Sequence, residues 1–299
     1  MQTNRKFMKQ TPFIGLFISI IGVSFAAVII KTCNAEPLII SFYRLLFTTL
    51  LLVPFVIFVP KIRNQISKIT KKEFFIMLII GIILALHFTF WITSLQYTTV
   101  ASSVILVTAH PILVAPLSYF LLKEHVSKVN ILGIGISLLG VFLLLFGNFS
   151  DAFDNISLFG NMLAILGGIA AGLYILGGRF MRRTVSVVIY AVIVYAIATV
   201  FLLAFIAISA TKLIVLTQQD FILILVMAIV SGVGGHTLYN WSLAHVRASL
   251  ASVALLGEPI GSALLAYLLP WINELPTEWT FIGGSIVLTG VYLTARTKK

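Results

Sequence analysis

Apolar segments of about 20 residues recur along almost the whole chain, and they constrain its fold more than any other feature. A helix of roughly 20 residues spans about 30 Å, the hydrocarbon thickness of a bilayer. Because 60% of the residues are hydrophobic and only 10% are charged, water cannot be this chain's only solvent. We predict an all-α integral membrane protein with ten transmembrane helices near 12–31, 38–59, 74–95, 100–122, 129–147, 157–177, 186–208, 220–243, 248–269 and 279–295.

The basic residues predict how these helices are oriented. If the N-terminus is cytoplasmic, most Lys and Arg residues fall in inside segments, namely Arg5, Lys6, Lys9, Lys61, Arg63, Lys68, Lys71, Lys72, Lys123, Lys128, Arg179, Arg182, Arg183, Arg247, Arg296, Lys298 and Lys299. The outside segments hold Lys31 and Lys212 with six acids, Glu36, Asp151, Asp154, Asp220, Glu274 and Glu278. This positive-inside bias predicts that both termini are cytoplasmic. The net charge of +11 therefore indicates orientation in a membrane, with no nucleic acid as a partner.

The two halves of the chain resemble each other. The stretch "TAHPILVAPLSYFLL" at 108–122 matches "LGEPIGSALLAYLLP" at 256–270. With shifts of 148 to 150 residues, the matched pairs include His87 with His236, His110 with Glu258, Pro111 with Pro259 and Glu124 with Glu274. We predict two five-helix repeats, 13–146 and 158–295. Because five is odd, the second repeat enters the membrane from the opposite side, which gives the inverted topology common in carriers.

Two matched ionisable residues lie at the predicted midplane. His110 and Glu258 are each about ten residues, or roughly 15 Å, from either end of their helices. A charge at this depth costs roughly 2.5–3.5 kcal/mol on insertion scales, so such residues face a protein interior or a wet cavity. We predict that both residues contact a substrate or a proton; the alternative is that His110 is a satisfied core histidine.

A proline follows each of these ionisable residues. Pro111 and Pro259 have no backbone N–H, so the carbonyls of Val107 and Leu255 should lose their usual helical partners. In a membrane such carbonyls need another partner, and interrupted helices often line carrier sites. We therefore predict kinks at both prolines that expose carbonyls to the site; the alternative is that the prolines only bend packed helices.

The second matched pair, His87 and His236, is accompanied by polar and aromatic residues. Trp91 and Asn240 each follow a histidine by four residues and so should share its helical face, with Tyr239 nearby. We predict that these five residues supply aromatic walls and hydrogen bonds to the substrate. A histidine bonded to a neighbouring helix and an interfacial tryptophan are the alternatives.

Glycines and one arginine complete the set of candidate residues. "SGVGGH" at 231–236 places Gly232, Gly234 and Gly235 beside His236, and we predict either a hinge or close helix packing there. Arg44 lies about six residues from the outer end of its helix, and we expect it to snorkel toward Glu36 as a structural residue. Small residues seven apart share a face and predict close packing, within the chain or between protomers, at Gly133, Gly140, Gly283 and Gly290.

These motifs, in this order, resemble the EamA-type branch of the bacterial drug/metabolite transporter superfamily. The resemblance covers nearly the whole chain and is carried by "GVSFAAVIIK", "EPLIISFYRLL", "SLQYTTVASSVILVTAHPILVAPLSYFLLKE", "YNWSLAHVRASLASVALLGEPIGSALLAYLL" and "GGSIVLTGVYL". It implies a multi-pass protein of the bacterial inner membrane that exports amino-acid-like solutes or related compounds.

The residues are compatible with a secondary carrier. No G-x-x-x-x-G-K-[ST] loop is present to bind ATP, and we expect no cofactor, no metal and no enzymatic activity. The predicted midplane offers one acid, several histidines and aromatics but few cations, which favours amino-acid-like solutes over sugar phosphates. Protons and a second copy of the chain are candidate partners. The alternatives are a facilitated uniporter or channel for another small neutral or cationic metabolite or drug, and an intramembrane enzyme.

Overall fold

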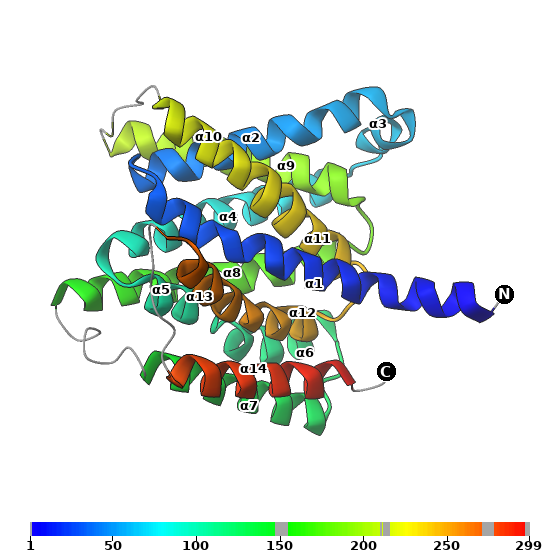
Figure 1. Ribbon diagram of the computed structural model, residues 1–299. Coiled ribbons are helices and arrows are strands. Elements are labelled where there is room, and N and C mark those ends of the chain that lie inside the picture. The colour runs from blue at the N-terminus through cyan, green and yellow to red at the C-terminus, as the bar shows by residue number, and fades with distance from the viewer. Residues whose placement is uncertain (1, 147–154, 210, 212–215, 271–277, 297–299) are drawn as a thin grey trace.

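A computed structural model of the chain describes residues 2–146, 155–209, 211, 216–270 and 278–296, and Figure 1 shows them as a bundle of helices. No strand occurs in these ranges. The helices of the first half are α1 (Gln2–Thr32), α2 (Pro37–Phe58), α3 (Pro60–Ile66), α4 (Lys71–Tyr97), α5 (Val100–Thr108), α6 (Pro111–Leu122) and α7 (Lys128–Phe146). Those of the second half are α8 (Asn155–Met181), α9 (Val187–Ile208), α10 (Gln218–Met227), η2 (Ala228–Thr237), α11 (Leu238–Leu243), α12 (Ala248–Ala254), η3 (Leu255–Gly257), α13 (Glu258–Leu268) and α14 (Glu278–Arg296).

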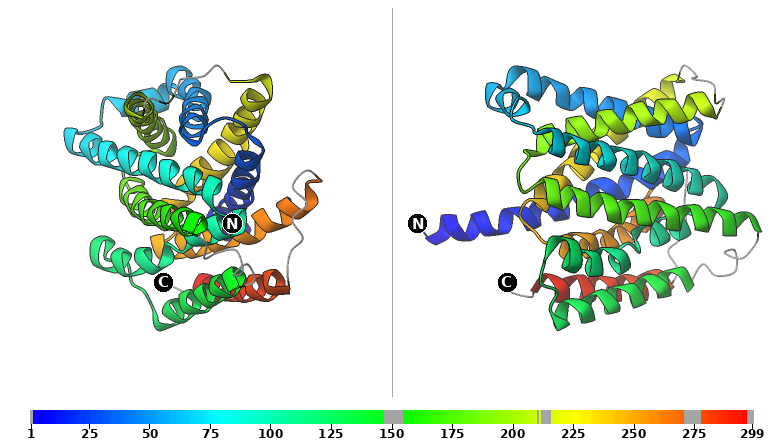
Figure 2. Two further views of the ribbon diagram at one scale, coloured as in Figure 1. Left: turned by 90° about the vertical axis from the view of Figure 1, so that its left-hand side faces the viewer. Right: turned by 180° about the vertical axis from the view of Figure 1, so that it is seen from behind.

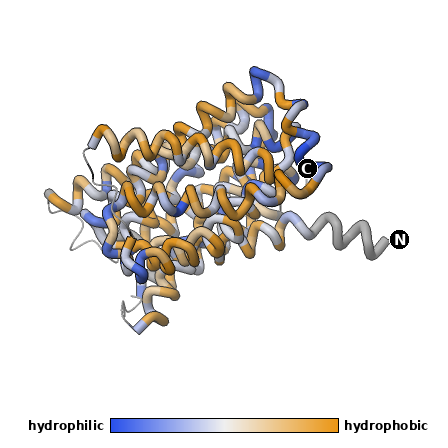
Figure 3. The backbone as a smooth tube through the Cα atoms, turned by 90° about the horizontal axis from the view of Figure 1, so that it is seen from above, coloured by the Kyte–Doolittle hydropathy of each residue, from blue (hydrophilic) through white to orange (hydrophobic). Residues whose placement is uncertain are grey.

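Among the described residues, eight helical segments are long and apolar enough to cross a membrane, and two shorter apolar helices, Lys128–Leu143 and Phe281–Ala295, accompany them. Apolar residues run along the helices, whereas hydrophilic residues gather toward the ends of the bundle (Figure 3). The all-helical membrane class is thus confirmed, while the count of ten spans and their orientation stay predictions. The charged residues Asp151, Asp154, Lys212, Glu274, Lys298 and Lys299 lie outside the described ranges.

The start of α1 and the end of α14 lie at the same end of the bundle (Figure 1), which we call the termini end. In the two repeats α1 corresponds to α8, α2 to α9, and α4 to α10, η2 and α11. Contacts between the halves occur in matching pairs: α4 packs on α8 as η2 and α11 pack on α1, and α4 packs on α9 as η2 packs on α2. Two further contacts, α2 with α9 and α7 with α14, join equivalent helices of the two halves. Figure 2 shows the same bundle along its length and from behind.

The predicted fourth helix is interrupted at its proline. α5 ends at Thr108, and α6 begins at Pro111 after a break at Ala109 and His110. The break is closed by hydrogen bonds from Ile112 N–H to the Ala109 carbonyl, 3.2 Å, and from the N–H of Leu113 to the His110 carbonyl, 2.9 Å. Proline suits the first position of a helix because no N–H is needed there. This segment is therefore two helices end to end.

The predicted ninth helix changes its winding at Pro259 and does not break. A 3₁₀ turn, η3, joins α12 to α13, and the Glu258 N–H donates to the Leu255 carbonyl. The Leu255 carbonyl loses its usual partner at Pro259, as predicted, but it is not left for the site, because the tighter turn supplies a donor three residues on. The Val107 carbonyl oxygen in the first half lies against α8, where a Cβ added to Gly168 would approach it to 2.8 Å.

The predicted eighth helix contains a π-helix, η2, where the glycines concentrate. Here α1 crosses η2 backbone against backbone: a Cβ on Gly22 would lie 2.8 Å from the Val230 carbonyl oxygen and 2.9 Å from the Gly235 nitrogen. The Ser231 hydroxyl donates to the Gly22 carbonyl at 2.8 Å. π-Turns are rare and are frequently found at functional sites, so η2 is a candidate functional segment.

The glycines of α7 and α14 pack within one chain. A Cβ on Gly140 would lie 2.6 Å from the Gly283 carbonyl oxygen, and one on Gly133 would lie 2.8 Å from that of Gly290. The expected close packing is present between these helices, so the faces considered for contact between protomers are occupied inside the chain.

Candidate functional site

A small cavity lies in the middle of the bundle, between the two halves. Its volume is about 50 Å³, which is room for a few water molecules. The first half contributes α1, α4 and α5, and the second contributes α8, η2, α11, η3 and α13. The lining residues are Val23, His87, Trp91, Val107, Thr108, His110, Ala171, Tyr174, Ile175, His236, Tyr239, Leu255 and Glu258. Six of the seven residues predicted from sequence to bind substrate therefore meet around one cavity.

The α4 wall of the cavity is an imidazole stacked on an indole. The His87 and Trp91 rings are 5.8 Å apart and 8° from parallel, as expected for residues four apart on a regular helix. His87 Nδ1 lies 2.9 Å from the Gly167 carbonyl oxygen. A carbonyl only accepts, so this hydrogen bond assigns the hydrogen to Nδ1 and leaves Nε2 as an acceptor in the neutral ring.

The cavity lining carries polar atoms without protein partners. Trp91 Nε1, His110 Nδ1 and the Tyr239 hydroxyl are buried and have no hydrogen-bond partner among the described residues. Glu258, the first residue of α13, is 7% exposed and faces the same cavity. Because buried polar groups in proteins are normally paired, such a cluster suits the binding of a polar molecule.

Asn240 does not line the cavity, which differs from the prediction. Its amide Nδ2 donates to the Tyr174 hydroxyl at 2.6 Å and to the Tyr195 hydroxyl at 3.2 Å. The Asn240 side chain is directed to these two hydroxyls and not into the cavity, whereas Tyr239, three residues after His236, lines it.

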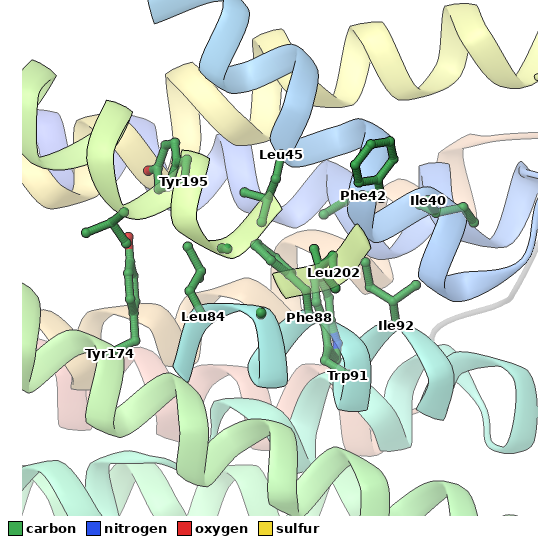
Figure 4. Close-up of a cluster of buried hydrophobic side chains, with 14 of the residues drawn as sticks. Ile40, Phe42, Leu45, Leu84, Phe88, Trp91, Ile92, Tyr174, Tyr195 and Leu202 are labelled. Carbon is green, nitrogen blue, oxygen red and sulfur yellow. The ribbon is translucent and has the colours of Figure 1, made fainter. Parts of the chain in front are cut away.

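Tyr174 is a cavity residue that sequence reasoning missed. It comes from α8 and lines the cavity while its hydroxyl holds Asn240. Figure 4 shows Tyr174 and Tyr195 near each other, with Phe88 and Trp91 side by side on α4. The sequence around it, "GGIAAGLYILGG", predicts close helix packing by its small residues and contains no pattern that singles out the tyrosine as a site residue.

Arg44 is buried, so the expectation that it snorkels outward is wrong. It is 1% exposed, and its guanidinium lies 4.5 Å from the centre of the Phe88 ring and 5.7 Å from that of Trp91. It borders a second, smaller cavity of about 10 Å³ that shares His236 with the central one. Helix α2 is packed between α4 and α9, and this packing turns Arg44 inward, which position along the sequence alone did not reveal.

The predicted hinge glycines have different surroundings. A Cβ at Gly232 would collide with Thr48 Oγ1, and one at Gly235 would lie 2.8 Å from Val23 Cγ1. A Cβ at Gly234 would have only the Ile229 carbonyl oxygen, 3.6 Å away, as a neighbour. Gly232 and Gly235 are therefore required for close packing. Packing does not explain the glycine at position 234.

A network of charges ties four helices together at the termini end. Glu124, after α6, forms an ion pair with Arg179 of α8 at 2.7 Å and a longer one with Arg183 at 3.5 Å. Its other oxygen accepts the N–H of Ala248, the first residue of α12, at 2.8 Å. Arg179 also donates to the Leu243 carbonyl, the last residue of α11, at 2.7 Å. The sequence analysis missed this network because its members are far apart in the chain.

A buried cavity with unpartnered polar atoms, set between two groups of long apolar helices with interrupted helices beside it, is typical of membrane transporters. The chain belongs to the EamA-like transporter family, which matches residues 11–146 and 158–296. This confirms the resemblance seen in the sequence.

The matches to similar proteins cover most of this chain. An uncharacterized transporter of Archaeoglobus fulgidus is 24% identical over 276 residues, 91% of this chain and 92% of the relative. The uncharacterized transporter YetK of Bacillus subtilis is 26% identical over 243 residues, 80% of this chain and 73% of the relative. A solved crystal structure has the same fold with a TM-score of 0.73 and 17% identity, covering 95% of this chain and 96% of that one.

Proposed function

We propose that this transporter is a secondary carrier that exports an amino acid or an amino-acid-like solute across the bacterial inner membrane. The observation that carries the proposal is the central cavity, where buried polar atoms without protein partners come from both halves of the chain. A site between two halves can open to either side when the halves rearrange, which is alternating access. The residues assigned to the substrate are His87, Trp91, His110, His236, Tyr239 and Glu258.

We extend the proposal to the topology. The two five-helix halves are inverted repeats with ten membrane-crossing helices and both ends in the cytoplasm. The matching pairs of helix contacts support this arrangement, as does the placement of both chain ends at one end of the bundle. The charge network of Glu124 lies at that same end, so it would hold the cytoplasmic side of the bundle together in this conformation.

The proposal is tested by counterflow in proteoliposomes. Vesicles containing the purified protein are loaded with an unlabelled amino acid, and uptake of the same labelled amino acid is followed for leucine, phenylalanine and other members of the standard set. A carrier gives a saturable, transient accumulation that protein-free vesicles lack. The Leu132→Ala variant is the matched control, since this side chain is 58% exposed and α7 contributes no residue to the cavity lining.

Two outcomes would contradict the proposal. Flux that rises linearly with concentration and shows no counterflow would indicate a channel. Counterflow of other metabolites, with none for any amino acid, would support the carrier mechanism but contradict the proposed substrate. The competing candidate, a facilitated uniporter, is separated by imposing a pH gradient, because only a proton-coupled carrier accumulates its substrate against a concentration gradient at the expense of protons.

A further inference from the structure

Arg44 is a buried cation without an anionic partner. The nitrogens Nη1 and Nη2 have no hydrogen-bond partner among the residues that the structure describes, and no carboxylate there lies within ion-pair distance of the guanidinium. The guanidinium lies instead over two aromatic rings, with Cζ 4.5 Å from the centre of the Phe88 ring and 5.7 Å from that of Trp91. A membrane-buried guanidinium of this kind needs a stabilising anion.

The aromatic contacts are too weak to replace an anion. Removing a charge from water costs more free energy than a cation–π contact returns, even after the protein relaxes. A guanidinium also offers five N–H donors that aromatic faces do not satisfy. An anion brought into contact with the guanidinium by a substrate would add the stabilisation that the aromatic rings do not give.

Glu258 is the carboxylate whose charge acts on Arg44, and the two residues border neighbouring cavities. Glu258 lines the central cavity, Arg44 borders the small cavity, and His236 lines both. Arg44 and Glu258 thus form a separated pair, one positive and one negative, whose cavities have His236 as a shared wall. A molecule with both charges would satisfy both ends at once.

We propose that this site binds a zwitterion, with a carboxylate directed to Arg44 and an ammonium group directed to Glu258. The inference rests on the proposed carrier function and narrows its substrate to molecules that carry both groups. Trp91 Nε1 and the Tyr239 hydroxyl, both without partners, are further donors for the carboxylate. Binding requires the His236 side chain, the shared wall of the two cavities, to turn aside.

The separated pair also predicts what the site rejects. An amine without a carboxylate leaves Arg44 unpaired, and an N-acylated amino acid leaves Glu258 unpaired. In each case a buried charge stays without its partner, and sites built for a polar group discriminate strongly against analogues that lack it. Arg44 is therefore a specificity residue for the carboxylate, and Glu258 for the ammonium group.

The test compares three probes of one carbon skeleton: L-leucine, 3-methylbutylamine and N-acetyl-L-leucine. A parallel set consists of L-phenylalanine, phenethylamine and N-acetyl-L-phenylalanine. Each compound is titrated as a competitor of labelled amino-acid counterflow by the purified, reconstituted protein. We expect both derivatives to compete at least about tenfold more weakly than the parent amino acid, which corresponds to 1.4 kcal/mol or more of discrimination.

Variants assign each discrimination to its residue. Arg44→Gln should weaken competition by the amino acid by about tenfold or more and leave competition by the amine unchanged, so that the two compete equally. Arg44→Lys should retain the preference for the amino acid. Glu258→Gln should weaken competition by the amino acid but not by the N-acetyl compound. If Arg44→Gln does not fold, the three-probe comparison on the wild-type protein still decides the matter.

Three results would overturn the inference. Equal competition by amine and amino acid in the wild-type protein would mean that the carboxylate is not recognised. An equal loss for all three probes in Arg44→Gln would mean that Arg44 supports the structure only. Counterflow of amines or other solutes, with none for amino acids, would reject the zwitterion and the proposed substrate together, while the carrier function itself would stand.

Discussion

An equivalent hydrogen bond occurs at both ends of the bundle, but the residues around it differ. At the termini end, Arg179 of α8 donates to the Leu243 carbonyl at 2.7 Å. At the opposite end, Lys31 of α1 donates to the Leu95 carbonyl, also at 2.7 Å. Both donors and both acceptors are 148 residues apart, so one contact is repeated in the two halves. Arg179 is held in addition by Glu124, whereas Lys31 borders a cavity of about 160 Å³ between α1, α2 and α4.

The difference shows that the halves share their packing but differ in where charge is concentrated. The first half offers His110 to the central cavity where the second offers Glu258. The first half has a regular helix, α4, beneath His87, whereas the second has the π-helix η2 beneath His236. A shared frame with unequal polar residues gives each half a separate task. Four predictions follow from the unequal positions, in order of decreasing effect.

The largest effect is expected at Glu258, the position that corresponds to His110 of the first half. If Glu258 carries a transported proton, Glu258→Gln should abolish accumulation driven by a pH gradient while exchange at saturating substrate continues, because an amide cannot take up the proton. His110→Gln should only weaken substrate binding by severalfold. Gradient-driven uptake and counterflow in the same vesicles measure both. Gradient dependence unchanged in Glu258→Gln would show that the acid does not couple transport to protons.

The next effect concerns the ion pair that only the termini end displays. Glu124→Gln preserves the side-chain shape but removes the charge that faces Arg179 and the Ala248 N–H. We expect a loss of about 2–3 kcal/mol, in the range measured when hydrogen bonds to charged groups are removed, because the Glu124 side chain is 5% exposed. Thermal unfolding in detergent, with Lys123→Gln as a neighbouring surface control, gives the value. An unchanged midpoint would mean that the backbone contacts alone hold this end.

Smaller effects are expected within η2, which has no counterpart in α4. Gly232→Ala should destabilise by about 1–3 kcal/mol because its Cβ collides with Thr48, as in other overpacked sites. Gly234→Ala meets no close neighbour and should stabilise by up to about 1 kcal/mol through helix propensity. If Gly234 is a hinge, this variant should lower the transport rate while raising the unfolding midpoint. Unchanged transport would assign Gly234 no role in bending.

The smallest effect is expected at Lys31. Its contact with Leu95 is partly exposed and has no described carboxylate beside it, so Lys31→Gln should cost at most about 0.5–1 kcal/mol, as for exposed polar pairs. The same unfolding assay, run beside Arg179→Gln, measures the contrast. A loss at Lys31 as large as that at Arg179 would indicate that the two ends are equally tied.

The membrane class and the grouping of most site residues could be predicted from the sequence. Burial in a bilayer requires long apolar segments, and internal repetition pairs residues of equal depth, which is why His110, Glu258, His87 and His236 were placed together correctly. The inward turn of Arg44 could not be predicted, because it depends on how α2 rotates against α4 and α9. Asn240 was misplaced because its partners, the Tyr174 and Tyr195 hydroxyls, come from helices far away in the chain and leave no local pattern.

The proline positions show the same limit in another way. Pro111 and Pro259 are equivalent in sequence, and each does interrupt the regular α-helix. One produces a two-residue break and the other a 3₁₀ turn that satisfies the Leu255 carbonyl. The missing N–H is dictated by the residue, but the way in which the chain compensates is decided by the neighbours, here α8 with Gly168 on one side.

The tight pair of α7 and α14 offers a fixed frame of reference for measuring motion. Neither helix contributes a side chain to the central cavity, and glycines bring their backbones into direct contact, as at Gly140 and Gly283. Spectroscopic labels at lipid-exposed positions such as Leu132 and Leu288 would therefore keep a constant separation through a transport cycle. Distances from that pair to labels on η2 or α13 would then report displacement of the cavity walls on an absolute scale.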